Sequence, residues 1–203
     1  MSVKLDYVIS VWEKKELNYW AIPKCASTFM LWNLLGRPKS NKDEINIGQV
    51  HSEKYVNYIT RKEALANGFT NLAITRHPYE RAASTYNDFF KKRTPSALKL
   101  HHMSFDDFLL YLLNKTDDST KTNVHLRSQS SFICDKKGKC YCDWVSDIEY
   151  LNLKEWMEWI HPDFDVRKIH TTENDIVLND KHKSLIFARY HEDFENLGYD
   201  KDE

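Results

Sequence analysis

The segment "YWAIPKCASTFMLWNLL", residues 19–35, places a lysine and small hydroxyl residues where an apolar strand pattern changes to a helix pattern. Pro23 breaks the first apolar run, and Lys24, Ser27 and Thr28 follow it. The first turn of a helix leaves backbone N–H groups unpaired and carries the positive end of the helix dipole. The segment therefore predicts a site for a phosphate or sulfate group. A helix start with a Ser or Thr cap and a solvated lysine is the alternative.

The segment "LAITRHPYERAASTYNDFF", residues 72–90, has the same order of strand pattern, basic residue and helix pattern. Arg76 follows the apolar run, Pro78 suits the first turn of a helix, and Ser84 lies about two turns further on. An arginine fork and a hydroxyl can together hold a phosphate. Each residue alone fits a surface position, but the two motifs together predict a ligand with two separate anionic groups.

Strands and helices must position these motifs, and the periodicity of the sequence predicts both. Alternating or continuous apolar runs predict strands at 7–12, 17–22, 70–75, 147–152 and 167–171. Apolar residues at helical spacing predict helices at 28–35, 79–93, 104–114, 153–160 and 182–198, and one helix or two short ones at 52–68. Strands that alternate with helices are typical of a mostly parallel sheet covered on both faces.

The composition predicts an ordinary globular protein with one domain over residues 1–203. Hydrophobic residues make up 41% and charged residues 29% of the chain. The 29 Lys and Arg residues nearly balance the 30 Asp and Glu residues, so no global positive field favours nucleic acid or an anionic membrane. No run approaches the about 20 apolar residues of a membrane span, and no signal-peptide pattern is present. We therefore expect no membrane segment and a cytoplasmic location.

Three of the four cysteines lie close together in "CDKKGKCYC", residues 134–142. The flanking segments predict a hairpin around the turn at 135–139. The thiols of Cys134, Cys140 and Cys142 could form a disulfide, contribute to a metal site or stay separate. Because a fourth ligand at a zinc-like spacing is missing, no metal is predicted.

At the two anion motifs, the sequence resembles the sulfotransferases that use 3′-phosphoadenosine 5′-phosphosulfate (PAPS). The similarity is to the Golgi carbohydrate branch, sulfotransferase family 2, and its microbial and viral relatives. That family has a "PK-x-x-S/T-S/T" loop and an "R-x-P-x-x-R-x-x-S-x-Y" segment, and this chain has "PKCAST" and "RHPYERAASTY". The resemblance implies a P-loop-NTPase-like α/β fold, with a central, mostly parallel sheet flanked by helices on both faces.

The resemblance also implies which residues bind the donor. The 5′-phosphosulfate would be held by the loop residues Lys24, Cys25, Ala26, Ser27 and Thr28. The 3′-phosphate would be held by Arg76 and Ser84. The product would be 3′-phosphoadenosine 5′-phosphate (PAP), and the chemistry requires no metal.

Two further segments are similar to the family. "VHLRSQSSFI" is similar to its "H-W-x-P-Q" stretch, which places His125 and Gln129 on the acceptor side, and "ARYHEDFENLGY" is similar to its closing "Y-x-x-D-F-x-x-F-G-Y". Residues 126–128 replace the aromatic residue and proline before Gln129, so the acceptor pocket departs from the family pattern. The sequence shows no pattern like the membrane anchor and stem of the Golgi enzymes, so we expect a microbial or viral origin.

Sulfuryl transfer needs a base that accepts the proton of the acceptor hydroxyl near neutral pH. His51 lies between the two motifs, where the uronyl 2-O-sulfotransferases of the family carry their catalytic histidine. Glu53 and His125 are the alternatives. Lys24 is the second catalytic residue that we predict, because its charge would offset the charge that develops on the departing phosphate oxygen.

We therefore predict a sulfotransferase that moves a sulfuryl group from PAPS to an acceptor hydroxyl. The first choice of acceptor is a carbohydrate, and a small metabolite, a lipid head group and a tyrosyl hydroxyl are the alternatives. Two other functions fit the motifs: a sensor that binds an adenosine bisphosphate without catalysis, and a small-molecule kinase. The loop lacks the glycines of a P-loop, and Asp147 is the one candidate for a strand-end acid that would bind Mg²⁺, which disfavours the kinase.

Overall fold

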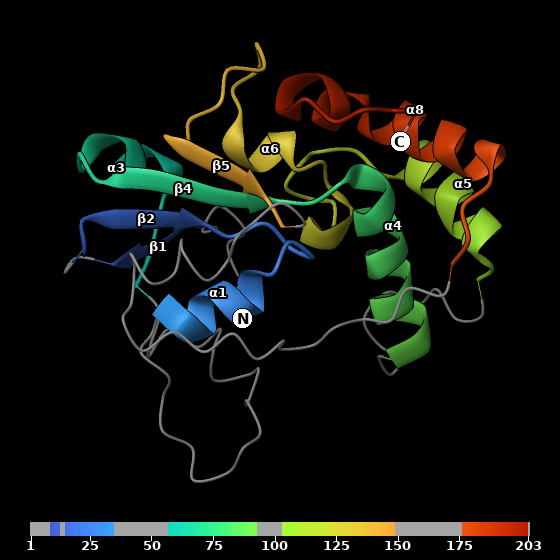
Figure 1. Cartoon of the computed structure of the whole chain (residues 1–203), viewed down its shortest axis with the longest axis horizontal. Helices are drawn as coiled ribbons and strands as arrows, with labels where there is room; N and C mark the ends of the chain where they lie inside the picture. The colour runs from blue at the N-terminus through green and yellow to red at the C-terminus, as the bar shows by residue number, and fades with distance from the viewer. Residues whose placement is uncertain (1–8, 13–14, 35–56, 93–102, 149–175, 203) are drawn as a thin grey trace, which may run out of the picture. The chain divides into compact units, whose positions relative to one another are not determined.

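The computed structural model describes residues 9–12, 15–34, 57–92, 103–148 and 176–202 (Figure 1). The chain divides into two compact units. The first unit contains the residues up to Thr75 and those from Tyr141 to Thr171. The second contains Arg76–Cys140 and the residues from Thr172 onward. The single domain expected over residues 1–203 stays a prediction.

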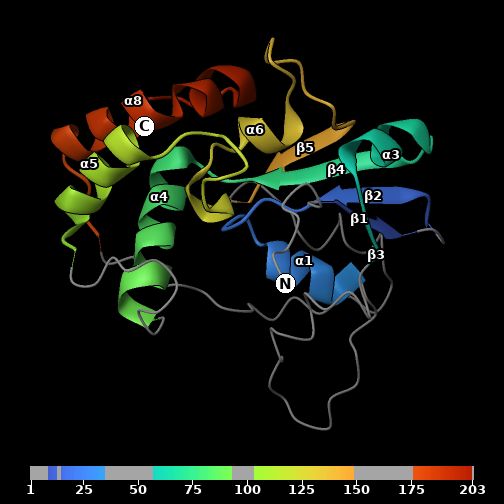
Figure 2. The same ribbon diagram turned by 180° about the vertical axis from the view of Figure 1, so that it is seen from behind.

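The first unit is built on a five-stranded sheet with the strand order β3-β1-β2-β4-β5. Its strands are β1 (Ile9–Trp12), β2 (Leu17–Trp20), β3 (Asn57–Ile59), β4 (Thr70–Thr75) and β5 (Trp144–Asp147). The pairs β2–β4 and β4–β5 are parallel, whereas β1 is antiparallel to both of its neighbours. The expected mostly parallel sheet is therefore present, with one reversed strand. Helices α1 (Ser27–Leu34) and α3 (Arg61–Ala66) flank it (Figure 1 and Figure 2).

The central strands of this sheet are buried on both faces. All four residues of β2 are buried, as are the last five of β4. Successive strand residues point to opposite faces, so both faces must be covered at this point. Two buried asparagines carry their polar groups into this interior without losing hydrogen bonds. Asn18 Nδ2 donates to Asn71 Oδ1 at 3.0 Å, and Trp20 Nε1 donates to the same oxygen at 2.9 Å.

The helix predicted at 52–68 is wrong in part, because Asn57–Ile59 form strand β3. These residues pair with Ile9–Val11 of β1, and the backbone hydrogen bonds offered by that strand outweigh a weak helical pattern. Helix α3 begins only after Thr60. The Thr60 side chain accepts the Glu63 N–H and the Glu63 carboxylate accepts the Thr60 N–H, which forms a capping box.

The three longest helices described in the second unit confirm the predicted helices at 79–93, 104–114 and 182–198. They are α4 (Pro78–Tyr86), which continues as a π-helix (Asn87–Lys92), α5 (Phe105–Lys115) and α8 (Asp180–Leu197). Ser104 caps the start of α5 by accepting the Asp107 N–H. Gly198, with φ of 75°, ends α8 in the left-handed conformation that glycine adopts without strain.

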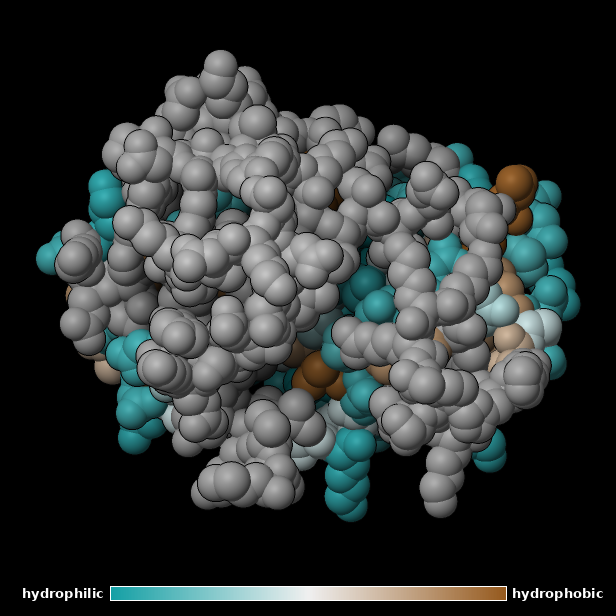
Figure 3. Space-filling model, turned by 90° about the horizontal axis from the view of Figure 1, so that it is seen from below, coloured by the Kyte–Doolittle hydropathy of each residue, from teal (hydrophilic) through white to brown (hydrophobic). Residues whose placement is uncertain are grey.

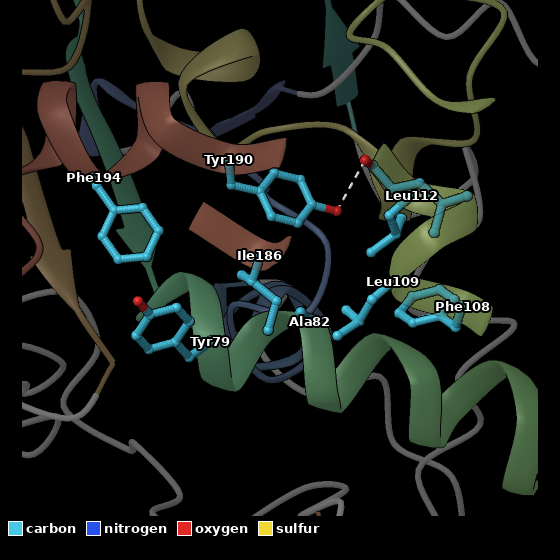
Figure 4. Packing of buried hydrophobic residues seen from close by; sticks show 9 residues of the cluster. Tyr79, Ala82, Phe108, Leu109, Leu112, Ile186, Tyr190 and Phe194 are labelled. Carbon is cyan, nitrogen blue, oxygen red and sulfur yellow. Dashed lines mark hydrogen bonds between the residues drawn. The ribbon is translucent and has the colours of Figure 1, made fainter. Parts of the chain in front are cut away.

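The hydrophobic core of the second unit lies where these three helices meet. Figure 4 shows the contributing side chains, which are Tyr79 and Ala82 of α4, Phe108, Leu109 and Leu112 of α5, and Ile186, Tyr190 and Phe194 of α8. Each large apolar side chain buried there contributes about 2 kcal/mol relative to an exposed one. The hydroxyl of Tyr190 donates to the Leu126 carbonyl oxygen at 3.0 Å, so the core also holds the segment before Gln129.

The hairpin predicted across residues 130–145 is corrected by the structure. Residues Ser130–Ile133 form a short helix, α6, instead of a strand. Only one antiparallel bridge, Cys134 with Cys140, closes the turn, and β5 joins the sheet of the first unit in parallel with β4. The elements predicted at 153–160 and 167–171, and most of that at 147–152, lie outside the described residues.

Hydrophobic side chains of the described residues lie as small separate areas among hydrophilic ones on the face shown in Figure 3. Scattered exposed apolar side chains of this kind are ordinary in globular proteins. Within the described ranges, no helix combines the length and apolar character needed to cross a membrane.

Candidate functional site

The loop between β2 and α1 begins with a tight turn. The Cys25 N–H donates to the Ile22 carbonyl oxygen at 3.2 Å, so Pro23 and Lys24 occupy the two central positions of a β-turn. Lys24 has φ of 68°, and a positive φ at this position after a proline is typical of a type II turn, where glycine is preferred. A lysine held in this conformation costs about 1 kcal/mol, so the loop keeps a strained residue at the place where the sequence predicts an anion site.

A second left-handed residue, Ala26, connects this turn to α1. Its φ is 55°, and its carbonyl oxygen accepts the Met30 N–H at 2.9 Å as the first bond of the helix. An alanine offers no side-chain oxygen to the N–H groups of the first helical turn. The side chains of Ser27 and Thr28, which open α1, are partly exposed. An anion with several oxygens is a suitable acceptor for such a helix start.

The side chain of Cys25 points into the protein interior, whereas the other loop residues are partly exposed. Its side chain is fully buried, its thiol donates to the Pro23 carbonyl oxygen at 3.7 Å, and its N–H belongs to the turn. These contacts indicate that Cys25 shapes the loop. A direct contact between Cys25 and the donor, which the resemblance implies, stays a prediction.

The second anion motif belongs to the second unit and begins with Arg76. Arg76 Nη2 lies 3.4 Å from Glu80 Oε2, and the side chain of Arg76 is 20% exposed. Arg76 Nε is buried, and no acceptor among the described residues lies within hydrogen-bonding reach of it. A buried N–H without an acceptor is costly, and a phosphate oxygen would satisfy it. The Arg76 guanidinium therefore fits an anionic ligand.

Ser84 lies one helical turn after Glu80 on α4. Residues four apart share a helix face, so Glu80 and Ser84 lie on the same side of α4. The side chain of Ser84 is buried, at 3% exposure. The structure places Ser84 two turns into the helix, as the sequence predicts, and its contact with a phosphate stays a prediction.

Gln129 is bound to Arg76 through two hydrogen bonds. The Arg76 N–H donates to Gln129 Oε1 at 2.9 Å, and Gln129 Nε2 donates to the Arg76 carbonyl oxygen at 2.7 Å. Gln129 is completely buried, and both ends of its side-chain amide are bound to the Arg76 backbone. The role expected for Gln129 on the acceptor side stays a prediction. Its side chain holds the backbone from which the Arg76 guanidinium extends.

The backbone of Gln129 is held in turn by α8. The carboxylate of Asp193 accepts the N–H groups of Gln129 at 2.9 Å and Ser130 at 2.7 Å. Burial raises the pKa of Asp193, and the positive charge of Arg81 and these two N–H groups oppose the rise. Arg81 is itself buried and donates to the Arg127 carbonyl oxygen at 2.8 Å. Asp193, Gln129 and Arg76 thus form a continuous series of contacts within the second unit.

His125 lies in a short 3-10 helix, η4 (Val124–Leu126), and is partly exposed. Its Nδ1 lies 3.0 Å from Asn123 Oδ1, and its ring makes a T-shaped contact with the ring of Phe89 at a centroid distance of 5.1 Å. These contacts orient the ring and leave part of it exposed. The position is compatible with the acceptor-side role predicted for His125.

The catalytic base predicted from the sequence, His51, and its alternative Glu53 lie outside the described residues. Within the described ranges, no group of three His, Cys, Asp or Glu side chains is arranged to hold a metal ion.

Sequence reasoning missed the roles of Glu80, Arg81 and Asp193. Glu80 binds the guanidinium of Arg76, and Asp193 and Arg81 hold the segment around Gln129. For two of these residues, Arg81 and Asp193, the sequence motifs contained a signal. Arg81 and Asp193 are the arginine and aspartate letters of the two family patterns "R-x-P-x-x-R" and "Y-x-x-D-F".

The fold and the two motifs define an α/β protein with separate groups of residues suited to anions. The model of the sulfotransferase family matches residues 8–200. The chain therefore belongs to the sulfotransferase family, as the resemblance indicates. No curated protein and no solved structure matches it.

Proposed function

We propose that this sulfotransferase uses PAPS as its donor and transfers the sulfuryl group to a hydroxyl of a carbohydrate or small metabolite. The observation that carries the proposal is the environment of Arg76. Its guanidinium has a buried Nε without an acceptor among the described residues, and its backbone is fixed by Gln129. A 3′-phosphate distinguishes PAPS from most other adenine nucleotides, and this arginine is suited to recognise it.

The 3′-phosphate would be held by Arg76 and Ser84. The arginine supplies two or more N–H donors in a planar arrangement, and the serine supplies a hydroxyl from α4. Glu80 now binds Arg76 at 3.4 Å, which is a long and partly exposed ion pair of little strength. A phosphate can therefore replace the Glu80 contact at small cost.

The 5′ end would be held by the loop that begins with Lys24. The N–H groups at the start of α1 and the hydroxyls of Ser27 and Thr28 would bind the oxygens of the anion. When bound, PAPS supplies the sulfuryl group and the phosphate leaving group. The Lys24 ammonium would offset the negative charge that develops on the leaving oxygen.

The acceptor hydroxyl must lose its proton as it attacks sulfur. We propose His51 as the base, with Glu53 and His125 as the alternatives, because an imidazole can accept a proton near neutral pH. His125 would also contact the acceptor. Gln129 is proposed on the acceptor side as well, and its side chain also positions Arg76.

Titration calorimetry of the full chain with PAP tests the donor assignment. We expect PAP to bind at least tenfold more tightly than adenosine 5′-phosphate, because only PAP carries the 3′-phosphate. Equal affinities for the two nucleotides, or no binding of PAP, would contradict the proposal. Transfer of label from radiolabelled PAPS to a panel of sugars and small hydroxyl compounds then tests the acceptor class. Tight PAP binding without transfer to any acceptor would indicate the sensor, and Mg²⁺-dependent ATP turnover would indicate the kinase.

A further inference from the structure

Two cysteines of the second unit, Cys134 and Cys140, face each other across a tight turn. They form an antiparallel bridge, and both are thiols in this structure. Cys134 ends helix α6, where its N–H donates to the Ser130 carbonyl oxygen at 2.8 Å. The function proposed above uses neither cysteine.

The register of the bridge is suited to a covalent bond between the two sulfurs. The Asp135 N–H, directly after Cys134, donates at 2.9 Å to the carbonyl oxygen of Lys139, directly before Cys140. This pattern makes the cysteines a non-hydrogen-bonded pair, in which the Cα atoms are about 4.5 Å apart and the side chains lie on one face. Disulfides have Cα separations of about 4.4–6.8 Å, so such a pair can be joined with little backbone movement.

The turn between the cysteines is held by its own hydrogen bonds. Asp135 Oδ1 accepts the N–H groups of Lys137 at 2.8 Å and Lys139 at 3.0 Å, and the Gly138 N–H donates to the Asp135 carbonyl oxygen at 3.0 Å. Gly138 has φ of 80°, which other residues rarely adopt, and a Cβ atom at this position would require the side-chain amide of Asn196 in α8 to move. The turn therefore keeps the cysteines in register before any covalent bond forms.

The two thiols differ in exposure. Cys134 is buried at 5% exposure, whereas Cys140 is partly exposed. A hydrogen bond with Cys140, followed by burial, raises the pKa of the Cys134 thiol. Because the thiolate is the reactive form, Cys140 is the sulfur that meets an oxidant first.

We propose that Cys134 and Cys140 are a redox-active pair that forms a reversible disulfide across the turn at 135–139. The oxidant is a low-molecular-weight disulfide. The Cys140 thiolate attacks one of its sulfurs, which breaks the S–S bond, forms a mixed disulfide and releases one small thiol. The Cys134 sulfur then attacks the Cys140 sulfur and expels the second small thiol. The protein loses two protons and two electrons, and the oxidant takes them up as two thiols.

The experiment equilibrates the full chain with excess oxidised glutathione, blocks the remaining thiols, and maps the linkage by trypsin digestion and mass spectrometry. Trypsin cleaves after Lys136 and Lys139, so a disulfide across the turn joins two peptides that otherwise separate. We expect this linkage in the wild-type chain and in Cys142→Ser, and its disappearance after dithiothreitol. A linkage to Cys142 in place of Cys140, or alkylation of both Cys134 and Cys140 after oxidation, would overturn the proposal.

Thermal unfolding provides a second measurement, in which the oxidised and reduced forms of the same chain are compared. A disulfide that closes so short a loop should raise the melting temperature of the oxidised wild-type chain by about 5 °C over the reduced chain. Cys142→Ser should show the same difference, and Cys140→Ser should show none. An equal melting temperature for oxidised and reduced wild type would count against the pair. Neither measurement uses donor or acceptor, so the result is independent of the proposed function.

Discussion

The side-chain amide of Gln129 binds both backbone polar groups of Arg76. Its Oε1 accepts the Arg76 N–H at 2.9 Å, and its Nε2 donates to the Arg76 carbonyl oxygen at 2.7 Å. Gln129 is fully buried, and its own N–H is bound by Asp193. Arg76 lies two residues before Pro78, the first residue of α4, so this contact fixes the backbone conformation from which the guanidinium extends.

Replacing Gln129 with Ala should weaken PAP binding about tenfold, because the Arg76 backbone loses both partners and its guanidinium is no longer held in place. Gln129→Glu keeps an acceptor for the Arg76 N–H and should lose less. Calorimetry with PAP and with adenosine 5′-phosphate provides the measurement. The affinity for the second nucleotide should stay unchanged, because it has no 3′-phosphate.

A purely structural effect of Gln129→Ala would weaken both nucleotides equally, and that outcome would contradict a positioning role. Ser131→Ala is the matched control. Ser131 lies two residues away in α6 and is partly exposed, and its hydroxyl donates to the Ser128 carbonyl oxygen instead of to Arg76.

Substitutions of Arg76 and of Glu80 should change the affinity for PAP in opposite directions. Arg76→Ala removes a charge-assisted contact worth about 1.5–3 kcal/mol, so the dissociation constant should rise at least tenfold. Glu80→Gln removes a negative charge 3.4 Å from the same guanidinium and should lower the dissociation constant about threefold. Titrations at low salt give the clearest comparison. Weaker PAP binding by Glu80→Gln would mean that the carboxylate orients Arg76 more than it competes with the phosphate.

His51→Ala should abolish most transfer while PAP affinity stays close to that of the wild-type chain, because a base acts on the acceptor and does not bind the nucleotide. A positioned base contributes about a hundredfold or more to the rate. His125→Ala is the comparison variant, and it should raise the Michaelis constant for the acceptor more than it lowers turnover. Near-normal turnover by His51→Ala would remove His51 from the mechanism and leave Glu53 and His125 as candidates.

Much of the fold could be predicted because the local sequence agrees with the final structure. The buried run at 70–75 forms β4, and Ser104 caps the helix that its spacing predicts. The errors arose where a distant partner decided the outcome. Asn57–Ile59 became a strand because β1 offers hydrogen bonds. Ser130–Ile133 became a helix whose first N–H group, together with that of Gln129 before it, is bound by Asp193 of α8.

Within the candidate site, the sequence predicts only those residues whose charge and position in the chain suggest a function. Lys24 and Arg76 stand out because of their charge and their place after apolar runs. The positive φ values of Lys24 and Ala26 have no signature in the sequence, since neither residue is a glycine. The buried side chain of Gln129 contacts the backbone of Arg76, which lies 53 residues away in the sequence. No periodicity in the sequence reveals such a contact.

Lys24 offers a test that separates charge from backbone conformation. Lys24→Ala and Lys24→Gly both remove the ammonium, so each should lower turnover about a hundredfold. They differ in the cost of φ at 68°, which glycine adopts without strain, so Lys24→Gly should be about 1 kcal/mol more stable than Lys24→Ala in urea unfolding. Equal stability of the two variants would mean that the turn changes its conformation when the lysine is removed.

Asp118 should make stability depend on pH in the acid range. Burial alone would raise the pKa of Asp118, but Arg189 at 3.0 Å and the N–H and hydroxyl of Ser128 outweigh it, and the net pKa is lowered. A carboxylate with a folded-state pKa below its unfolded value of about 3.9 stabilises the fold above that value. This contribution is lost as pH falls through the folded-state pKa.

Asp118→Asn should therefore lower the free energy of unfolding by about 2 kcal/mol in urea unfolding at pH 7, and this difference from wild type should shrink below about pH 4. Exposed Asp200→Asn is the control, and a difference for Asp118→Asn that stays constant with pH would show that packing, and not charge, is the cause.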